Sequence, residues 1–130
     1  MKQTREQSVA TALLAYLASG GTLDSIMTEL PAFKTQLQTA FDWMKSNAQC
    51  TAAEVQRRAE HLRDVIQSKE DAITSSRFDD AAEFRAEECT LSESMGLGAP
   101  IGPLWNTFAR LGVDEQIRNL SQLLGQNGKH

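Results

Sequence analysis

Apolar residues recur at helical spacing along most of the chain, and short glycine or proline breaks separate the runs. The first run covers residues 5–19, and intervals of three and four residues there predict a helix with one buried face. Its apolar positions are Val9, Leu13, Tyr16 and Leu17. Gly20 and Gly21 follow, and glycine supplies the left-handed residue that closes many helices. We therefore expect the first helix to end there.

Two further helices are expected before residue 50. Thr22 is placed to cap a short helix over residues 23–30, and Pro31 stops it because the residue before a proline is pushed out of helical geometry. The third helix should cover residues 34–46. The expected inner positions are Leu23, Ile26, Met27 and Leu30, then Leu37, Ala40, Phe41 and Met44. Residues 1–50 are thus predicted to form a tri-helical unit with tight breaks.

Residues 51–95 contain no glycine or proline and are predicted to form two long helices folded back on each other. Thr51 and Glu54 have the spacing of a capping box at the first helix start. Residues 75–77 are the expected turn. The predicted buried positions of the first helix are Val55, Ala59, Leu62, Ile66, Ala72 and Ile73. This stripe is the kind that two packed helices share.

One face of the second helix of this hairpin combines small and apolar residues. The positions expected on it are Phe78, Ala81, Ala82, Arg85, Cys89 and Leu91. The adjacent alanines would let two helix backbones approach closely. We expect Phe78 to point inward and plug the end of the hairpin. Arg85 can lay its stem on apolar surface and offer its guanidinium to a carboxylate.

The last third, residues 96–130, begins with a loop and continues as two short amphipathic helices. Pro103 suits the first turn of one helix, Gly112 ends it, and residues 125–130 should fray. These helices carry Trp105, Phe108, Ile117, Leu120 and Leu124. That is more apolar surface than two short helices bury between themselves. Either they fold over the N-terminal helices or they meet another subunit in a homodimer.

These patterns define an all-α fold: a small bundle of about six helices with a long central antiparallel helical hairpin. The composition agrees, since 41% of the 130 residues are apolar and only three are proline. We expect residues 1–50, 51–95 and 96–130 to pack together as one domain.

Charge is concentrated in the hairpin. Residues 51–95 carry six cationic and eleven acidic side chains, whereas the net charge of the whole chain is −4. An acidic surface argues against general nucleic-acid binding, which relies on basic groups.

The sequence does not disclose a reaction. His61 has Glu60 and Asp64 nearby as imaginable metal ligands, but such positions diverge around a helix, so a solvated face explains them better. Cys50 and Cys89 have no metal-like spacing and are expected as free thiols in a reducing cytosol. We therefore predict a cytoplasmic non-enzyme with no catalytic residue, no metal, no cofactor and no membrane span.

The second hairpin helix carries a family resemblance. The run KEDAITSSRFDDAAEFRAEECTL resembles the UVR motif, a helical hairpin found in the excision-repair subunit UvrB, in the middle domain of ClpC-type AAA+ unfoldases and in McsA-like proteins. The resemblance covers about residues 62–91. The matching positions are Ala72, Phe78, Asp79, Ala81, Ala82, Arg85 and Leu91. Ala86 departs from it, because the family often has aspartate there.

The resemblance implies a protein-docking surface and no catalysis. The partner would be an AAA+ Clp-type unfoldase or another UVR-containing protein, with this chain as adaptor or regulator. The residues expected to bind it are Arg77, Phe78, Asp79, Asp80, Glu83 and Arg85.

Two alternatives remain open. The run LLAYLASGGTLDSIMTELPAFKTQLQTAFDWM, residues 13–44, resembles the helical core of the DUF433 group of small bacterial proteins, which implies a helix-turn-helix-like DNA-binding or antitoxin-like regulator. The family's preceding strand is absent here, and Asp42 opposes Lys34 and Lys45 on the third helix. The other alternative is a structural subunit of an assembly.

Overall fold

A computed structural model describes residues 5–97 and 101–128. All regular structure in these ranges is helical, which confirms the predicted all-α class. The elements are α1 (Arg5–Ala18), α2 (Leu23–Glu29), the short 3-10 turn η1 (Pro31–Phe33), α3 (Lys34–Ala48), α4 (Ala52–Thr74), α5 (Phe78–Ser94), α6 (Gly102–Ala109) and α7 (Val113–Gly128). The described residues thus form seven α-helices, against about six expected.

Helix boundaries follow the local chemistry that predicted them. The Thr22 hydroxyl accepts a hydrogen bond from the Ser25 N–H at 3.1 Å, and the Thr51 hydroxyl accepts one from the Glu54 N–H at 3.2 Å. Each bond satisfies an N–H group that has no partner within its own helix. At the predicted turn, Ser76 takes a φ of 59° between α4 and α5.

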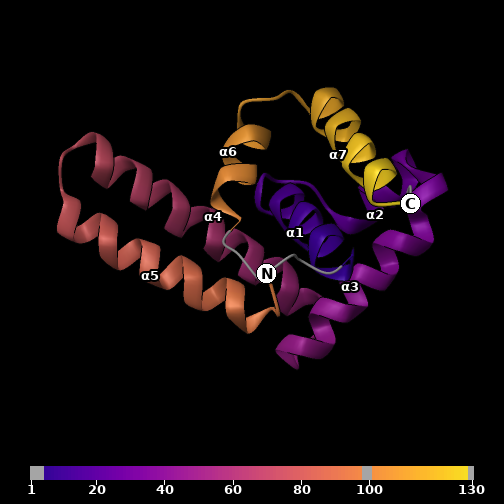
Figure 1. The fold of residues 1–130 in the computed structure, drawn as a ribbon, viewed down its shortest axis with the longest axis horizontal. Helices are drawn as coiled ribbons and strands as arrows, with labels where there is room; N and C mark the ends of the chain where they lie inside the picture. Colours follow the sequence, from indigo (N-terminus) through magenta and orange to yellow (C-terminus); the bar gives the residue numbers. More distant parts are fainter. Residues whose placement is uncertain (1–4, 98–100, 129–130) are drawn as a thin grey trace.

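The centre of the molecule is α1, and not the hairpin (Figure 1). Residues 9–18 are buried apart from Thr11, and α3, α4, α6 and α7 pack around them. The prediction of a single buried face was therefore wrong for this helix. Leu14 and a series of alanines make the opposite face apolar too, so that further helices can cover it. A helix apolar all round is a core helix.

The C-terminal helices fold over α1 and bury their apolar residues within the chain. Phe108, Leu120 and Leu124 are buried, and Ile117 packs at the edge of the same core. The Trp105 indole N–H donates to the Ala18 carbonyl at 3.3 Å, which satisfies a carbonyl at the end of α1. Of the two expectations for this surface, packing on the N-terminal helices describes the structure.

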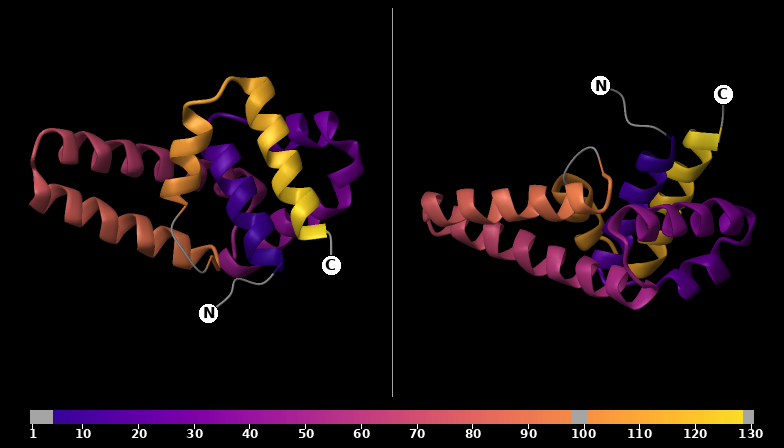
Figure 2. Two further views of the ribbon diagram at one scale, coloured as in Figure 1. Left: turned by 45° about the horizontal axis from the view of Figure 1, so that its top comes forward. Right: turned by 90° about the horizontal axis from the view of Figure 1, so that it is seen from below.

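Helices α4 and α5 lie antiparallel and project from the other helices as an arm (Figures 1 and 2). We call residues 52–94 the hairpin arm. Near α1, the α4 residues Val55, Leu62 and Ile66 are fully buried. Farther out the cover ends, and residues 73–80 are all exposed. The hairpin therefore has a buried base and an exposed tip.

The last helix, α7, extends farther than the sequence predicted. Helix α7 continues to Gly128, past residue 125 where fraying was expected to begin, and residues 129–130 lie outside the described part, as do residues 98–100 of the predicted loop. Among the described helices, no single helix is long and apolar enough to cross a membrane. One pair, Gln7–Ala18 with Leu23–Glu29, meets this criterion of length and composition only when both helices are counted together, and the pair is bent by 111°.

Candidate functional site

A groove of about 590 Å³ runs along the hairpin arm between α4, α5 and the start of α6. Its apolar lining comes from Ile73, Phe78, Ala81, Ala82 and Pro103. Its charged lining comes from Lys69, Glu70, Arg85 and Glu88. The groove therefore combines an apolar floor with charges of both signs on its walls.

Small side chains explain why the groove exists. Ala72 on α4 and Ala81 on α5 are buried where the two helices face each other. Alanine lets the helix backbones approach but fills little of the space beside them. Ala82 is exposed on the same side of α5, so no large side chain covers the floor there. At the tip, Ile73 is 45% exposed and Phe78 is 65% exposed.

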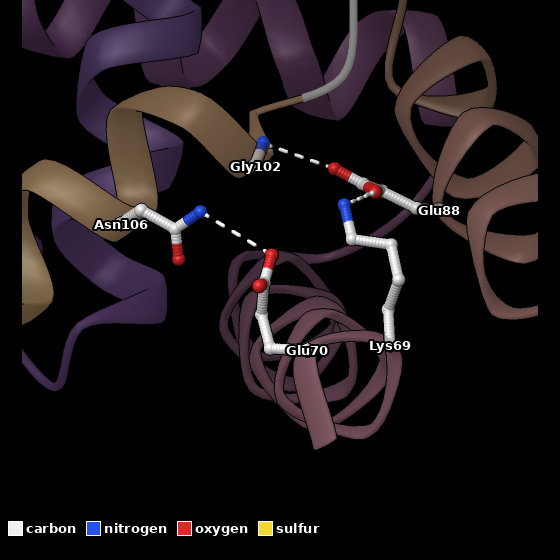
Figure 3. Close-up of polar contacts among 5 residues, drawn as sticks. All are labelled: Lys69, Glu70, Glu88, Gly102 and Asn106. Atoms are coloured by element: carbon white, nitrogen blue, oxygen red, sulfur yellow. Dashed lines mark hydrogen bonds and ion pairs between the residues drawn. The ribbon is translucent and has the colours of Figure 1, made fainter. Parts of the chain in front are cut away.

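A buried charge cluster closes the base of the groove (Figure 3). Glu88 is only 1% exposed. One of its carboxylate oxygens lies 2.8 Å from the Lys69 ammonium group, and the other accepts the Gly102 N–H at 2.9 Å. Gly102 is the first residue of α6, so Glu88 satisfies a free N–H at the positive end of that helix. Glu88 thereby joins α4, α5 and α6.

A second, weaker link supports the same junction. The Asn106 amide on α6 donates to a Glu70 carboxylate oxygen on α4 at 3.5 Å. The contact is possible because α6 lies across the arm at this level, as Figure 3 shows. A Cβ atom added at Gly102 would lie 2.6 Å from a Glu88 carboxylate oxygen, so the junction also depends on glycine at this position. The groove wall is therefore fixed to the rest of the protein.

Charges farther out are exposed. Arg77 and Asp80 form an ion pair at 3.4 Å, with side chains 56% and 51% exposed. Arg85 lines the groove, is exposed, and has no ion pair or hydrogen bond with any described residue. Lys69, in contrast, is held by Glu88. Arg85 is thus the cation in the groove that a ligand could engage without breaking an existing ion pair.

The structure separates the six predicted partner-binding residues into two groups. Phe78 and Arg85 line the groove. Arg77, Asp79, Asp80 and Glu83 are exposed on the arm but are not part of the groove lining. All six are accessible, but only two share one concave surface.

The prediction that Phe78 plugs the hairpin was wrong. The turn itself closes the end of the arm, since the Arg77 N–H donates to the Ala72 carbonyl at 2.7 Å. Phe78 is the first residue of α5, and its ring lies mostly in solvent. Ile73, which was predicted to be buried, is also exposed, because this end of α4 lies beyond the helices that cover the base of the arm.

Sequence reasoning missed the polar side of the groove. It did not single out Lys69, Glu70 or Glu88, although all three line the groove. One signal was available: Glu88 follows Ala81 by seven residues, and that spacing returns to the same face of a helix. Its partner Gly102 lies beyond the hairpin, so the bond itself could not be predicted from spacing.

Other groups with chemical potential do not form a comparable site. His61 lies 3.0 Å from Glu87 across the arm, rather than clustering with Glu60 and Asp64. No group of three or more histidine, cysteine or acidic side chains suited to a metal ion occurs in the described residues. Cys50 and Cys89 are free and half-buried.

Comparison with protein-family models, with curated proteins and with solved structures found no match.

Proposed function

We propose that this chain is a protein-interaction module that docks a partner through the groove of the hairpin arm. The observation that carries the proposal is the exposure of Phe78 and Ile73 beside an open, partly apolar groove. Burying a phenylalanine or isoleucine side chain releases about 1.5–3 kcal/mol. The chain does not use these side chains in its own core, so a partner that covers them would gain that energy.

The resemblance to the UVR motif points to the same surface. Phe78 and Arg85 are both motif positions, and both line the groove. The proposed role is an adaptor or regulator, and the proposed partner is an AAA+ Clp-type unfoldase or another UVR-containing protein. The proposal assigns no catalytic residue, metal or cofactor.

The DNA-binding alternative has no comparable support. Lys45, one of two lysines on α3, is paired with Asp42 at 3.4 Å, which reduces the positive potential of that helix. Phosphate binding relies on cationic groups that are free to meet the backbone.

Affinity capture from the source cells would test the proposal. The bait would be the wild-type chain, the Phe78→Ser variant and the Arg85→Ala/Asp80→Ala double variant. Val113→Ser is a matched control, because Val113 is 66% exposed and lies outside the groove. Truncating a hot-spot residue at the centre of an interface costs about 2 kcal/mol or more, so we expect at least about 10-fold less captured partner with Phe78→Ser and no loss with the control.

Equal recovery of the same partners with all baits would reject docking through this groove. If the wild-type chain bound duplex DNA at physiological salt, and the groove variants bound it equally well, the DNA-binding alternative would be supported instead.

A further inference from the structure

We infer that the groove takes an amphipathic helix of another protein, with net positive charge and one carboxylate that meets Arg85. This inference rests on the proposed docking function and specifies the chemistry of the partner.

The shape favours a helix because the arm already holds one on the same side. Helix α6 lies across the arm nearer α1, where Glu88 and Glu70 hold Gly102 and Asn106 (Figure 3). Pro103, in the first turn of α6, lines the groove, and from there the groove extends to Phe78 at the tip. The groove thus continues the surface that α6 covers. A furrow between two helices with small residues on its floor suits the ridge of a third helix.

The surrounding charge favours a basic partner. Residues 69–88 carry three cationic and seven acidic side chains, a net charge of −4, which equals the net charge of the whole chain. Such a concentration of acidic groups attracts cationic surfaces and repels anionic ones during encounter. Glu70 adds a half-buried carboxylate in the groove itself.

Arg85 adds a specific requirement inside this acidic region. Its neighbour in the groove, Lys69, is neutralised by Glu88 at 2.8 Å, whereas Arg85 has no partner among the described residues. A helix that covered Arg85 with apolar atoms would leave a charge without water or a counter-ion, which is unfavourable. The favoured helix therefore carries a single carboxylate at this point, within an otherwise basic polar face.

A second copy of the chain is a poorer occupant. Two tips that each carry −4 would repel each other at close range.

Selection of helical peptides of about 16 residues, displayed on phage and panned against the full chain, would test the inference. Binders would be counter-selected against the Phe78→Ser variant, so that only groove-dependent sequences remain. We expect apolar residues at helical spacing, more lysine and arginine than acidic residues, and one acidic position shared among the binders.

A charge exchange would then test the role of Arg85 with the best synthetic peptide. Arg85→Glu should weaken binding about 10-fold, and replacing the shared peptide carboxylate with lysine should restore binding to that variant. Val113→Ser, the exposed apolar control, should bind the original peptide as tightly as the wild type does. Phe78 and Arg85 are exposed, so both variants should retain the wild-type melting temperature.

The outcomes separate this inference from the proposed function. Binders that depend on the groove but are acidic or neutral would overturn the inference and leave groove docking intact. A wild-type dimer in sedimentation equilibrium that Phe78→Ser dissociates would assign the groove to a second copy, and would also overturn the inference. If selection yields no groove-dependent binder, both the inference and the proposed function fail.

Discussion

Glu88 is an acidic side chain with almost no contact with solvent, and it is the residue on which the groove wall depends. Its two oxygens serve two different partners, the Lys69 ammonium group and the Gly102 N–H. A buried carboxylate is tolerated when it is paired and hydrogen-bonded, and both conditions hold here. Gly102 leaves the space that this arrangement needs.

Gly102→Ala tests this close packing at the scale of one methyl group. The added Cβ would lie 2.6 Å from a Glu88 oxygen and 3.3 Å from the Lys69 ammonium nitrogen, so the cluster must shift. We expect a loss of about 1–3 kcal/mol in the free energy of unfolding, measured by urea denaturation.

Gly125→Ala is the matched control, because Gly125 also lies in a helix but a Cβ there meets no atom within 4 Å. Alanine in a helix interior should stabilise the protein by about 0.5–1 kcal/mol. If both variants change stability equally, the packing at Gly102 is looser than described.

At the scale of single residues, the sequence is a poor guide to which side chains are buried and which are exposed. Phe78 was expected inside because aromatic residues usually are, and Glu88 was not expected there because acidic residues rarely are. Both expectations depend on how far the neighbouring helices extend over the arm. Neither residue's own sequence neighbourhood contains that information.

Individual helices, in contrast, were largely predictable from the sequence. Gly20, Pro31, Thr51 and the 75–77 turn all mark helix ends in the structure, because capping and turn formation depend on residues close in the chain. The junction between the arm and α6 was not predictable. It joins residues 14 positions apart through a side chain and a backbone N–H.

Lys69→Met tests how strongly this junction couples the three helices. The change leaves Glu88 buried with only the Gly102 N–H as partner, and loss of one member of a buried pair costs about 3–5 kcal/mol. We expect a loss toward the lower end of that range, because Lys69 itself is 16% exposed. Chemical denaturation followed by circular dichroism would measure it.

The double variant Lys69→Met/Glu88→Gln should be more stable than Lys69→Met alone. The glutamine amide oxygen can still accept the Gly102 N–H, and no unpaired charge remains. Arg77→Met, which breaks the exposed pair with Asp80, should change stability by less than about 1 kcal/mol. Coupling between Lys69 and Glu88 would be excluded if the stability lost by the double variant equalled the sum of the losses of Lys69→Met and Glu88→Gln measured separately.

The whole molecule combines a helix-wrapped core with an arm that leaves it. Four helices cover α1, whereas residues 73–80 are all exposed. The sequence predicted the helices but assigned the central position to the hairpin, since the hairpin is the longest uninterrupted segment. The length of a helical segment does not determine whether it lies at the centre of the fold. Helix α1 lies there because it has apolar residues on both sides, and these require neighbouring helices on every side.

This contrast predicts an uneven response to hydrogen exchange and to truncation. Among the described residues, amides of residues 10–18 should exchange slowest and those of residues 74–80 fastest, because exposed segments open locally. Leu13→Ala should cost about 2–5 kcal/mol, whereas Phe78→Ala should change stability by no more than about 0.5 kcal/mol. Exchange mass spectrometry and thermal denaturation would measure these differences, and slow exchange at the tip would show that the arm is covered in solution.

The arm is joined to the rest of the protein from its base, where the Arg58 guanidinium on α4 lies 3.5 Å from the Ser94 hydroxyl on α5, out to the α6 junction at Glu88. Residues 73–80, beyond that junction, are all exposed. Its reach is therefore adjustable independently of the core. Removing or adding one turn in both helices between Lys69 and Glu88 would move the tip by about 5.4 Å and leave the base contacts in place. Paired insertions or deletions in this segment offer evolution, or a protein engineer, a way to set the distance at which a partner is held.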